Sequence, residues 1–155
     1  MESMNKQPSQ PSIRGGAYVL HLKVKGTVTV QVGALGNIAL AAGNYVYVGS
    51  ARKSIESRVS RHQRLAKAKA GKLHWHIDYL LTHSGIELVR QDSYAGNGEC
   101  DIARHIASLQ GSSVPVPRFG ASDCRSGCRA HLFRVGKTGR KKISPAAIRK
   151  KINKM

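Results

Sequence analysis

The stretch that decides the fold is residues 17–32, which have the sequence AYVLHLKVKGTVTVQV. Residues 17–24 are rich in strand-forming side chains, and every second one is apolar. Those on one face are Tyr18, Leu20, Leu22 and Val24. Residues 27–32 alternate strictly, which gathers three valines on one face. Lys25-Gly26 between the two segments is typical of a tight turn, so the stretch predicts a β-hairpin.

A third β segment, residues 44–49, follows a loop punctuated by Gly33, Gly36 and Gly43. Parallel strands need a crossover connection of a dozen or more residues, usually a helix, and residues 17–49 leave no room for one. The three segments therefore predict an antiparallel sheet.

Helical periodicity dominates downstream of this sheet. Ser54 can cap a helix that runs to residue 69, with an inner stripe of Ile55, Val59, His62 and Ala66. We expect further helices over 73–82 and 99–109, the latter with Ile102, Ala103 and Ile106 inward, and short strands over 86–90 and 131–135. The predicted class is α+β: one domain with a small antiparallel sheet flanked by helices.

Length and composition agree with one domain. The chain has 155 residues, 41% of them hydrophobic, which suffices for a core and excludes wholesale disorder. We expect a disordered tail over 1–14, a folded domain over 15–135, and a basic extension over 136–155 with a short helix opening at Ser144-Pro145. The N-terminus has no apolar signal segment. Three cysteines are an odd number, which argues against a disulfide framework, so we expect a cytoplasmic protein.

Positive charge is the strongest compositional signal. Lys and Arg number 26 against 8 Asp and Glu, for a net charge of +18. Such an excess predicts a polyanionic partner, and no amphipathic helix suits a membrane surface, so we expect nucleic acid. No protein partner can be inferred. The expected phosphate-binding residues are Arg52, Arg61, Arg64, Arg140, Lys141 and Lys142.

Two features of the helices could carry chemistry. Arg58 and His62 are four residues apart, so they share a helix face at the edge of the apolar stripe. A guanidinium there suits a phosphate, although Arg58 could equally be one more cation on a basic helix. Glu99 falls on the stripe that faces the core, although a Glu in the first turn of a helix is also favoured by the helix dipole.

Several motifs together resemble a known nuclease superfamily. Gly16-Ala17-Tyr18, Tyr47-Val48-Gly49, Arg58-Val59-Ser60 followed by His62, and a helical Glu99 resemble the signature of the GIY-YIG nucleases. The blocks at 43–51, 61–62, 75–80, 99–100, 119–124 and 131–133 are similar to its Uri-type endonuclease branch. The resemblance spans residues 15–135.

The chain departs from the superfamily pattern in two respects. Alanine and valine replace the middle isoleucines of the two tripeptides, whose side chains point away from the tyrosine face of a strand. Tyr18 and Tyr47 are 29 positions apart, more than is usual in the superfamily. We expect the strand over 27–32 to account for the excess.

The resemblance implies a hydrolase, a metal-dependent endonuclease that cleaves phosphodiester bonds in nucleic acid, with DNA favoured over RNA. Glu99 would bind one Mg²⁺ or Mn²⁺ ion, and Arg58 would stabilise the phosphate in the transition state. Tyr18 would position or deprotonate the attacking water, with help from Tyr47 or His62. The alternative is a basic nucleic-acid-binding protein that retains the fold without turnover.

A second metal is suggested by Cys124-x3-Cys128-x2-His131. Thiolates and imidazole are zinc ligands, but a structural zinc site needs four of them. Cys100, His74 or His76 could supply the fourth. Buried thiols without a metal are the favoured interpretation.

Overall fold

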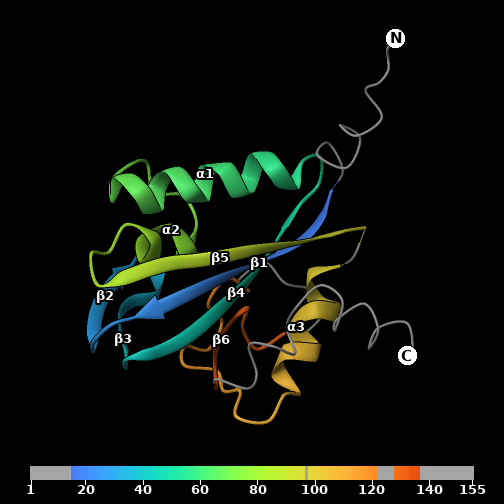
Figure 1. Cartoon of the computed structure of the whole chain (residues 1–155). Coiled ribbons are helices and arrows are strands. Elements are labelled where there is room, and N and C mark those ends of the chain that lie inside the picture. The colour runs from blue at the N-terminus through green and yellow to red at the C-terminus, as the bar shows by residue number, and fades with distance from the viewer. Residues whose placement is uncertain (1–14, 97, 122–127, 137–155) are drawn as a thin grey trace.

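A four-stranded antiparallel sheet is the centre of the molecule in the computed structural model, which describes residues 15–96, 98–121 and 128–136 (Figure 1). Its spatial order is β5-β1-β4-β6. The strands are β1 (Gly16–Val24), β4 (Gly43–Ala51), β5 (Ile86–Ala95) and β6 (Leu132–Val135). The α+β class with a small antiparallel sheet is confirmed.

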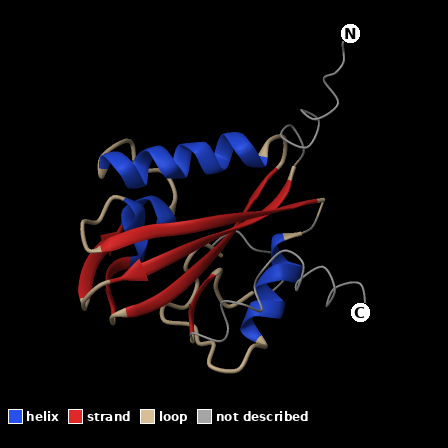
Figure 2. Cartoon of the chain, viewed as in Figure 1, coloured by secondary structure: helices blue, strands red, loops and turns tan. Residues whose placement is uncertain are grey.

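Helices cover both faces of this sheet (Figure 2). The long helix α1 (Ile55–Ala68) and the short α2 (His76–Leu81) lie on one face, and α3 (Glu99–Ala107) lies on the other. Strand β1 is central and buried on both sides, which explains why its sequence is almost continuously apolar.

The alternation along β1 assigns its side chains to two cores. Tyr18, Leu20, Leu22 and Val24 share one core with the buried side chains of α1 and α2, as the sequence predicts. Ala17 and Val19 point to the opposite face. There they pack against the predicted inner stripe of α3, namely Ile102, Ala103 and Ile106.

The predicted hairpin over residues 17–32 is wrong. Strand β2 (Val28–Val32) pairs with β3 (Gly36–Leu40) in a separate two-stranded sheet, across the 3₁₀ turn η2 (Gly33–Leu35). Both edges of β1 are already occupied by β4 and β5, so β2 has no free edge of β1 to join. The glycines that suggested a loop have positive φ at positions 33 and 36 and form the turn at the start of β3.

Other boundaries differ by a few residues. Helix α2 starts at His76 rather than at 73, and α3 ends at Ala107 rather than at 109. Strand β5 continues to Ala95 because the nine-residue β1 offers partners along its whole length, through one register shift. Ser54 caps α1 as predicted, accepting a hydrogen bond from the Ser57 amide at 3.1 Å.

Parts of the predicted organisation lie outside the described residues. These are the tail over 1–14 and, apart from Gly136, the basic extension with its helix from Ser144. Within the part of the chain that the structure describes, no helix is long and apolar enough to cross a membrane.

Candidate functional site

The two tyrosines of the motif lie on neighbouring antiparallel strands. Tyr18 on β1 is opposite Gly49 on β4, and Tyr47 on β4 is opposite Leu20. Both rings belong to the core beneath α1 and α2, and only 2% of Tyr18 and 8% of Tyr47 is exposed. The intervening β2-β3 hairpin accounts for their separation in sequence, as expected, although its pairing was not predicted.

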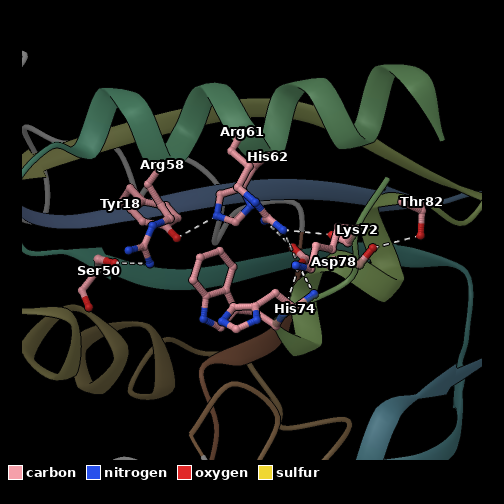
Figure 3. A network of polar contacts seen from close by, with 10 residues as sticks. Tyr18, Ser50, Arg58, Arg61, His62, Lys72, His74, Asp78 and Thr82 are labelled. Atoms are coloured by element: carbon pink, nitrogen blue, oxygen red, sulfur yellow. Dashed lines mark hydrogen bonds and ion pairs between the residues drawn. The ribbon is translucent and has the colours of Figure 1, made fainter. Parts of the chain in front are cut away.

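Tyr18 makes a direct polar contact with α1. Its Oη lies 2.8 Å from Nε2 of His62, which is fully buried (Figure 3). Burial raises the pKa of the Tyr18 phenol, and the nearby Arg58 guanidinium opposes that shift. Burial lowers the pKa of His62 to about 4. At neutral pH the pair is therefore an uncharged phenol hydrogen-bonded to an uncharged imidazole.

Arg58 lies beside this pair at the end of α1 nearest Ser50. Its guanidinium stands 4.4 Å from the centroid of the Trp75 ring and donates a hydrogen bond to the Ser50 carbonyl at 3.2 Å. Among the residues that the structure describes, no carboxylate forms an ion pair with Arg58. The cation therefore keeps the capacity to bind an added anion.

Arg61, which was predicted to bind phosphate, contacts a carboxylate of the protein itself. It donates two hydrogen bonds to the carboxylate of Asp78, at 2.9 and 3.0 Å, and one to the Lys72 carbonyl (Figure 3). Its guanidinium also lies 4.7 Å from the Trp75 centroid. Asp78 is fully buried, so Arg61 serves first as the partner of a buried carboxylate.

The other predicted phosphate-binding residues divide into two groups. Arg52 and Arg64 are exposed and remain candidates for contact with a polyanion. Arg140, Lys141 and Lys142 lie outside the described residues.

Glu99 is the first residue of α3, and its carboxylate is about one-third exposed. Its Oε2 lies 3.6 Å from Nδ1 of His131, the residue that precedes β6. Its charge helps to raise the pKa of both Tyr18 and Tyr47, although burial is the larger cause for each phenol. Glu99 therefore acts electrostatically on the tyrosines and also lies within ion-pair distance of His131.

His131 also belongs to a group of possible metal ligands with two cysteines. The ligand atoms of Cys100, Cys128 and His131 all lie within 4.8 Å of one another, so this group could bind a metal ion. Cys124 lies outside the described residues. Of the candidates for a further ligand, Cys100 belongs to the group; the His74 ring packs on Trp75, and His76 Nδ1 accepts a hydrogen bond from the Gly120 amide.

Sequence reasoning missed two residues of the site. No role was predicted for Trp75 beyond its place in the helix expected over 73–82, yet it contacts two guanidinium groups. Asp78 was not expected to pair with Arg61. The sequence does contain a signal for both contacts. The first helix is rich in arginine, and residues 75–78 offer one tryptophan and one carboxylate with which those arginines could pair.

Comparison with known proteins gives a family and no function. Residues 17–153 match the family described as "Domain of unknown function DUF123". The searches of curated proteins and of solved structures each found no match. Since the match covers most of the chain, this protein belongs to the DUF123 family.

Proposed function

We propose that the protein is a metal-dependent endonuclease that hydrolyses phosphodiester bonds in nucleic acid, with DNA as the expected substrate. The observation that carries the proposal is the 2.8 Å contact between Tyr18 Oη and His62 Nε2, beside Arg58. Attack of water on a phosphate diester needs groups that transfer a proton and a cation that binds the phosphate; here the cation is Arg58, which forms no ion pair with a carboxylate among the described residues. The motif resemblance to GIY-YIG nucleases supports the same assignment.

The proton would move along two contacts. As water attacks phosphorus, Tyr18 Oη accepts a proton from the water and passes its own proton to His62 Nε2. Neutral imidazole can accept that proton, and burial of His62 keeps it neutral before the reaction. The burial that makes imidazolium unfavourable also favours return of the proton to solvent afterwards.

Arg58 would bind the scissile phosphate. Trp75 and the Ser50 carbonyl hold the guanidinium at the end of α1 near Tyr18. A guanidinium donates several hydrogen bonds in one plane, which matches the oxygens of a phosphate. Charge that develops on those oxygens in the transition state would be stabilised by this cation.

Glu99 would hold one Mg²⁺ or Mn²⁺ ion. Carboxylate oxygen suits both ions, and Mg²⁺ is commonly bound by one or two carboxylates together with substrate phosphate and water, so a single partly exposed Glu fits. Such an ion supplies neutralisation of charge on the phosphate and on the leaving oxygen.

The polyanionic partner is supported by charge. The chain carries a net charge of +18. Arg52, just before α1, and Arg64, on α1, are both exposed. Phosphate binding by such residues releases counterions and strengthens association at low salt.

A second candidate function is nucleic-acid binding without cleavage. The observation in its favour is the burial of Tyr18 and Tyr47, since burial raises the pKa of both phenols and makes ionisation costly. In that case the motif residues would serve the core alone.

One experiment separates the two candidates. The full chain is incubated with duplex, single-stranded, nicked and branched DNA and with RNA, in Mg²⁺ or Mn²⁺ at low salt. Arg58→Ala and Glu99→Gln run beside Lys67→Ala, which removes one exposed charge from the same helix as Arg58. Cleavage by wild type and Lys67→Ala, with neither of the other two active, supports the endonuclease. Binding by all four proteins with no cleavage supports the second candidate.

A further inference from the structure

A cluster of metal-ligand side chains lies outside the proton-transfer pair. Cys100 comes from the first turn of α3, while Cys128 and His131 come from the segment before β6. Their ligand atoms lie within 4.8 Å of one another. We propose that these three residues bind one Zn²⁺ ion, and that Glu99 orients His131 toward it.

The donor set selects the ion. Thiolate and imidazole ligands favour Zn²⁺ over Mg²⁺ or Mn²⁺, which prefer oxygen. Ligand atoms around tetrahedral zinc lie roughly 3.3–3.8 Å apart, because each is about 2.0–2.3 Å from the metal. Cys100 Sγ and His131 Nε2 are 4.0 Å apart, so only a small contraction would bring these two atoms to the separation of two ligands on one zinc ion.

His131 is held as a ligand would be. Only 2% of the residue is exposed, and its Nε2 faces the Cys100 sulfur. Its main chain is fixed on both sides: the amide donates to the Phe119 carbonyl at 2.8 Å, and the carbonyl accepts from the Val48 amide at 2.9 Å. The main chain of His131 therefore cannot shift without breaking two backbone hydrogen bonds, and the burial of the residue leaves the ring little room to turn away.

The second ring nitrogen points to Glu99. Within the described part of the chain, His131 Nδ1 has no hydrogen-bond partner, and Glu99 Oε2 is 3.6 Å away. Histidines that bind zinc through one nitrogen commonly donate the other N–H to a carboxylate, which fixes the tautomer and the ring orientation. Zinc on Nε2 would place the proton on Nδ1, facing that carboxylate, so Glu99 acts as a positioning residue.

The proposed ion would join α3 to the edge of the sheet. Cys100 belongs to the helix, while His131 precedes β6, which pairs with β4. Three protein ligands leave a fourth position for water. This inference uses contacts independent of the Tyr18–His62 pair, and its test requires no nucleic acid.

The test is Co²⁺ binding to the full metal-free chain, followed by absorption spectroscopy. We expect one Co²⁺ per chain, near-ultraviolet thiolate-to-cobalt charge transfer, and tetrahedral bands in the visible. Cys128→Ser and His131→Gln should weaken or abolish these bands. His74→Gln, which replaces an imidazole on an exposed residue outside the cluster, should retain the wild-type spectrum and stoichiometry.

If a variant fails to fold, measurements on the wild-type protein still test the zinc site. Absence of charge transfer from wild-type protein, or X-ray absorption of the zinc-loaded chain without sulfur ligands, overturns the site. An unchanged spectrum in folded Cys128→Ser does the same.

Glu99→Gln tests the positioning role. We expect the same cobalt spectrum with roughly 10–100-fold weaker affinity, the usual effect of removing a partner of a metal-bound histidine. An unchanged Co²⁺ affinity would show that Glu99 does not orient His131. A changed cobalt spectrum would show that Glu99 is itself a ligand of the ion.

Discussion

Gly49 and Tyr18 face each other across β1 and β4, and the Tyr18 ring occupies the space that a side chain at Gly49 would fill. A Cβ at Gly49 would lie 2.4 Å from Tyr18 Cζ and 2.5 Å from its Oη. The glycine of the Tyr-Val-Gly motif thus has a steric role: it lets the phenol lie flat over the sheet and reach His62.

Replacing this glycine should displace the phenol. We expect Gly49→Ala to lower the free energy of unfolding by about 1–3 kcal/mol, the usual cost of overpacking a core. The variant should also lose the proposed nucleic-acid cleavage, because the contact of Tyr18 with His62 would break. Urea unfolding and a cleavage assay measure the two effects. Gly26→Ala is the matched control, since nothing lies within 4 Å of its Cβ; equal effects in both variants would contradict the steric explanation.

His62 should make stability depend on pH. Its pKa is about 4 in the folded chain and about 6.5 when unfolded, so between these values the unfolded chain binds more protons. The free energy of unfolding should therefore fall as pH drops from about 6.5 to 4, by roughly 3 kcal/mol for this group. Urea unfolding at a series of pH values measures the slope.

His62→Gln is the comparison for that slope, since it removes the titrating ring. His131, whose pKa is also lowered by burial, contributes in the same direction in both proteins. Parallel curves for wild type and variant would refute the assignment to His62.

Asp78 should be the most costly carboxylate to remove. Burial alone would raise its pKa, but hydrogen bonds from Arg61 and from the Trp75 and His74 amides lower it. Asp78→Ala leaves these donors unpaired, so we expect a loss of about 3–5 kcal/mol in the free energy of unfolding. Asp101→Ala, which breaks an exposed pair with Arg104, should cost less than about 1 kcal/mol. Similar losses in both would show that burial of the pair does not matter.

Trp75 should control the position of Arg58. We expect Trp75→Ala to slow single-turnover cleavage by between tenfold and about a hundredfold, because the guanidinium loses the ring that holds it. Trp75→Phe keeps an aromatic face and should slow cleavage less. Leu73→Ala, which truncates an exposed apolar side chain nearby in sequence, is the control. Wild-type rates in Trp75→Ala would exclude the role.

Exposed arginines should set the salt dependence of the proposed nucleic-acid binding. Arg52→Ala and Arg64→Ala should each reduce the slope of log affinity against log salt concentration by about 1. Arg104→Ala, an exposed arginine on α3 across the sheet, should leave the slope unchanged. Titrations of a labelled duplex at several salt concentrations give these slopes, and an identical slope for all four proteins would count against α1 as the binding face.

Strands and helices whose hydrophobic residues recur at a regular spacing could be predicted from the sequence. The alternation of Tyr18, Leu20, Leu22 and Val24 and the helical stripe of Ile102, Ala103 and Ile106 identify buried faces that the structure confirms. In the first helix, Ala66 was expected to face inward but is half-buried, whereas Leu65, which was not assigned to the stripe, is buried. The helical spacing alone could not tell which of these two residues is buried, because both lie near the edge of the apolar stripe of the helix.

Contacts between distant residues could not be predicted in the same way. The pairing of Arg61 with Asp78 and the approach of Glu99 to His131 join segments 17 and 32 residues apart. Motif resemblance alone placed Glu99 with the tyrosines and the arginine, without indicating its neighbour His131.

The sequence by itself determined the local structure of this protein: the strand at 16–24, the capped helix after Ser54, the inward face of α3 and the charge of +18. Only the tertiary structure decided that β2 pairs with β3, that Arg61 neutralises Asp78, and that Cys100 joins Cys128 and His131. The physical reason is that periodicity reports which face of one element is buried, whereas a partner is chosen by competition among all free edges and all charged groups in the folded chain.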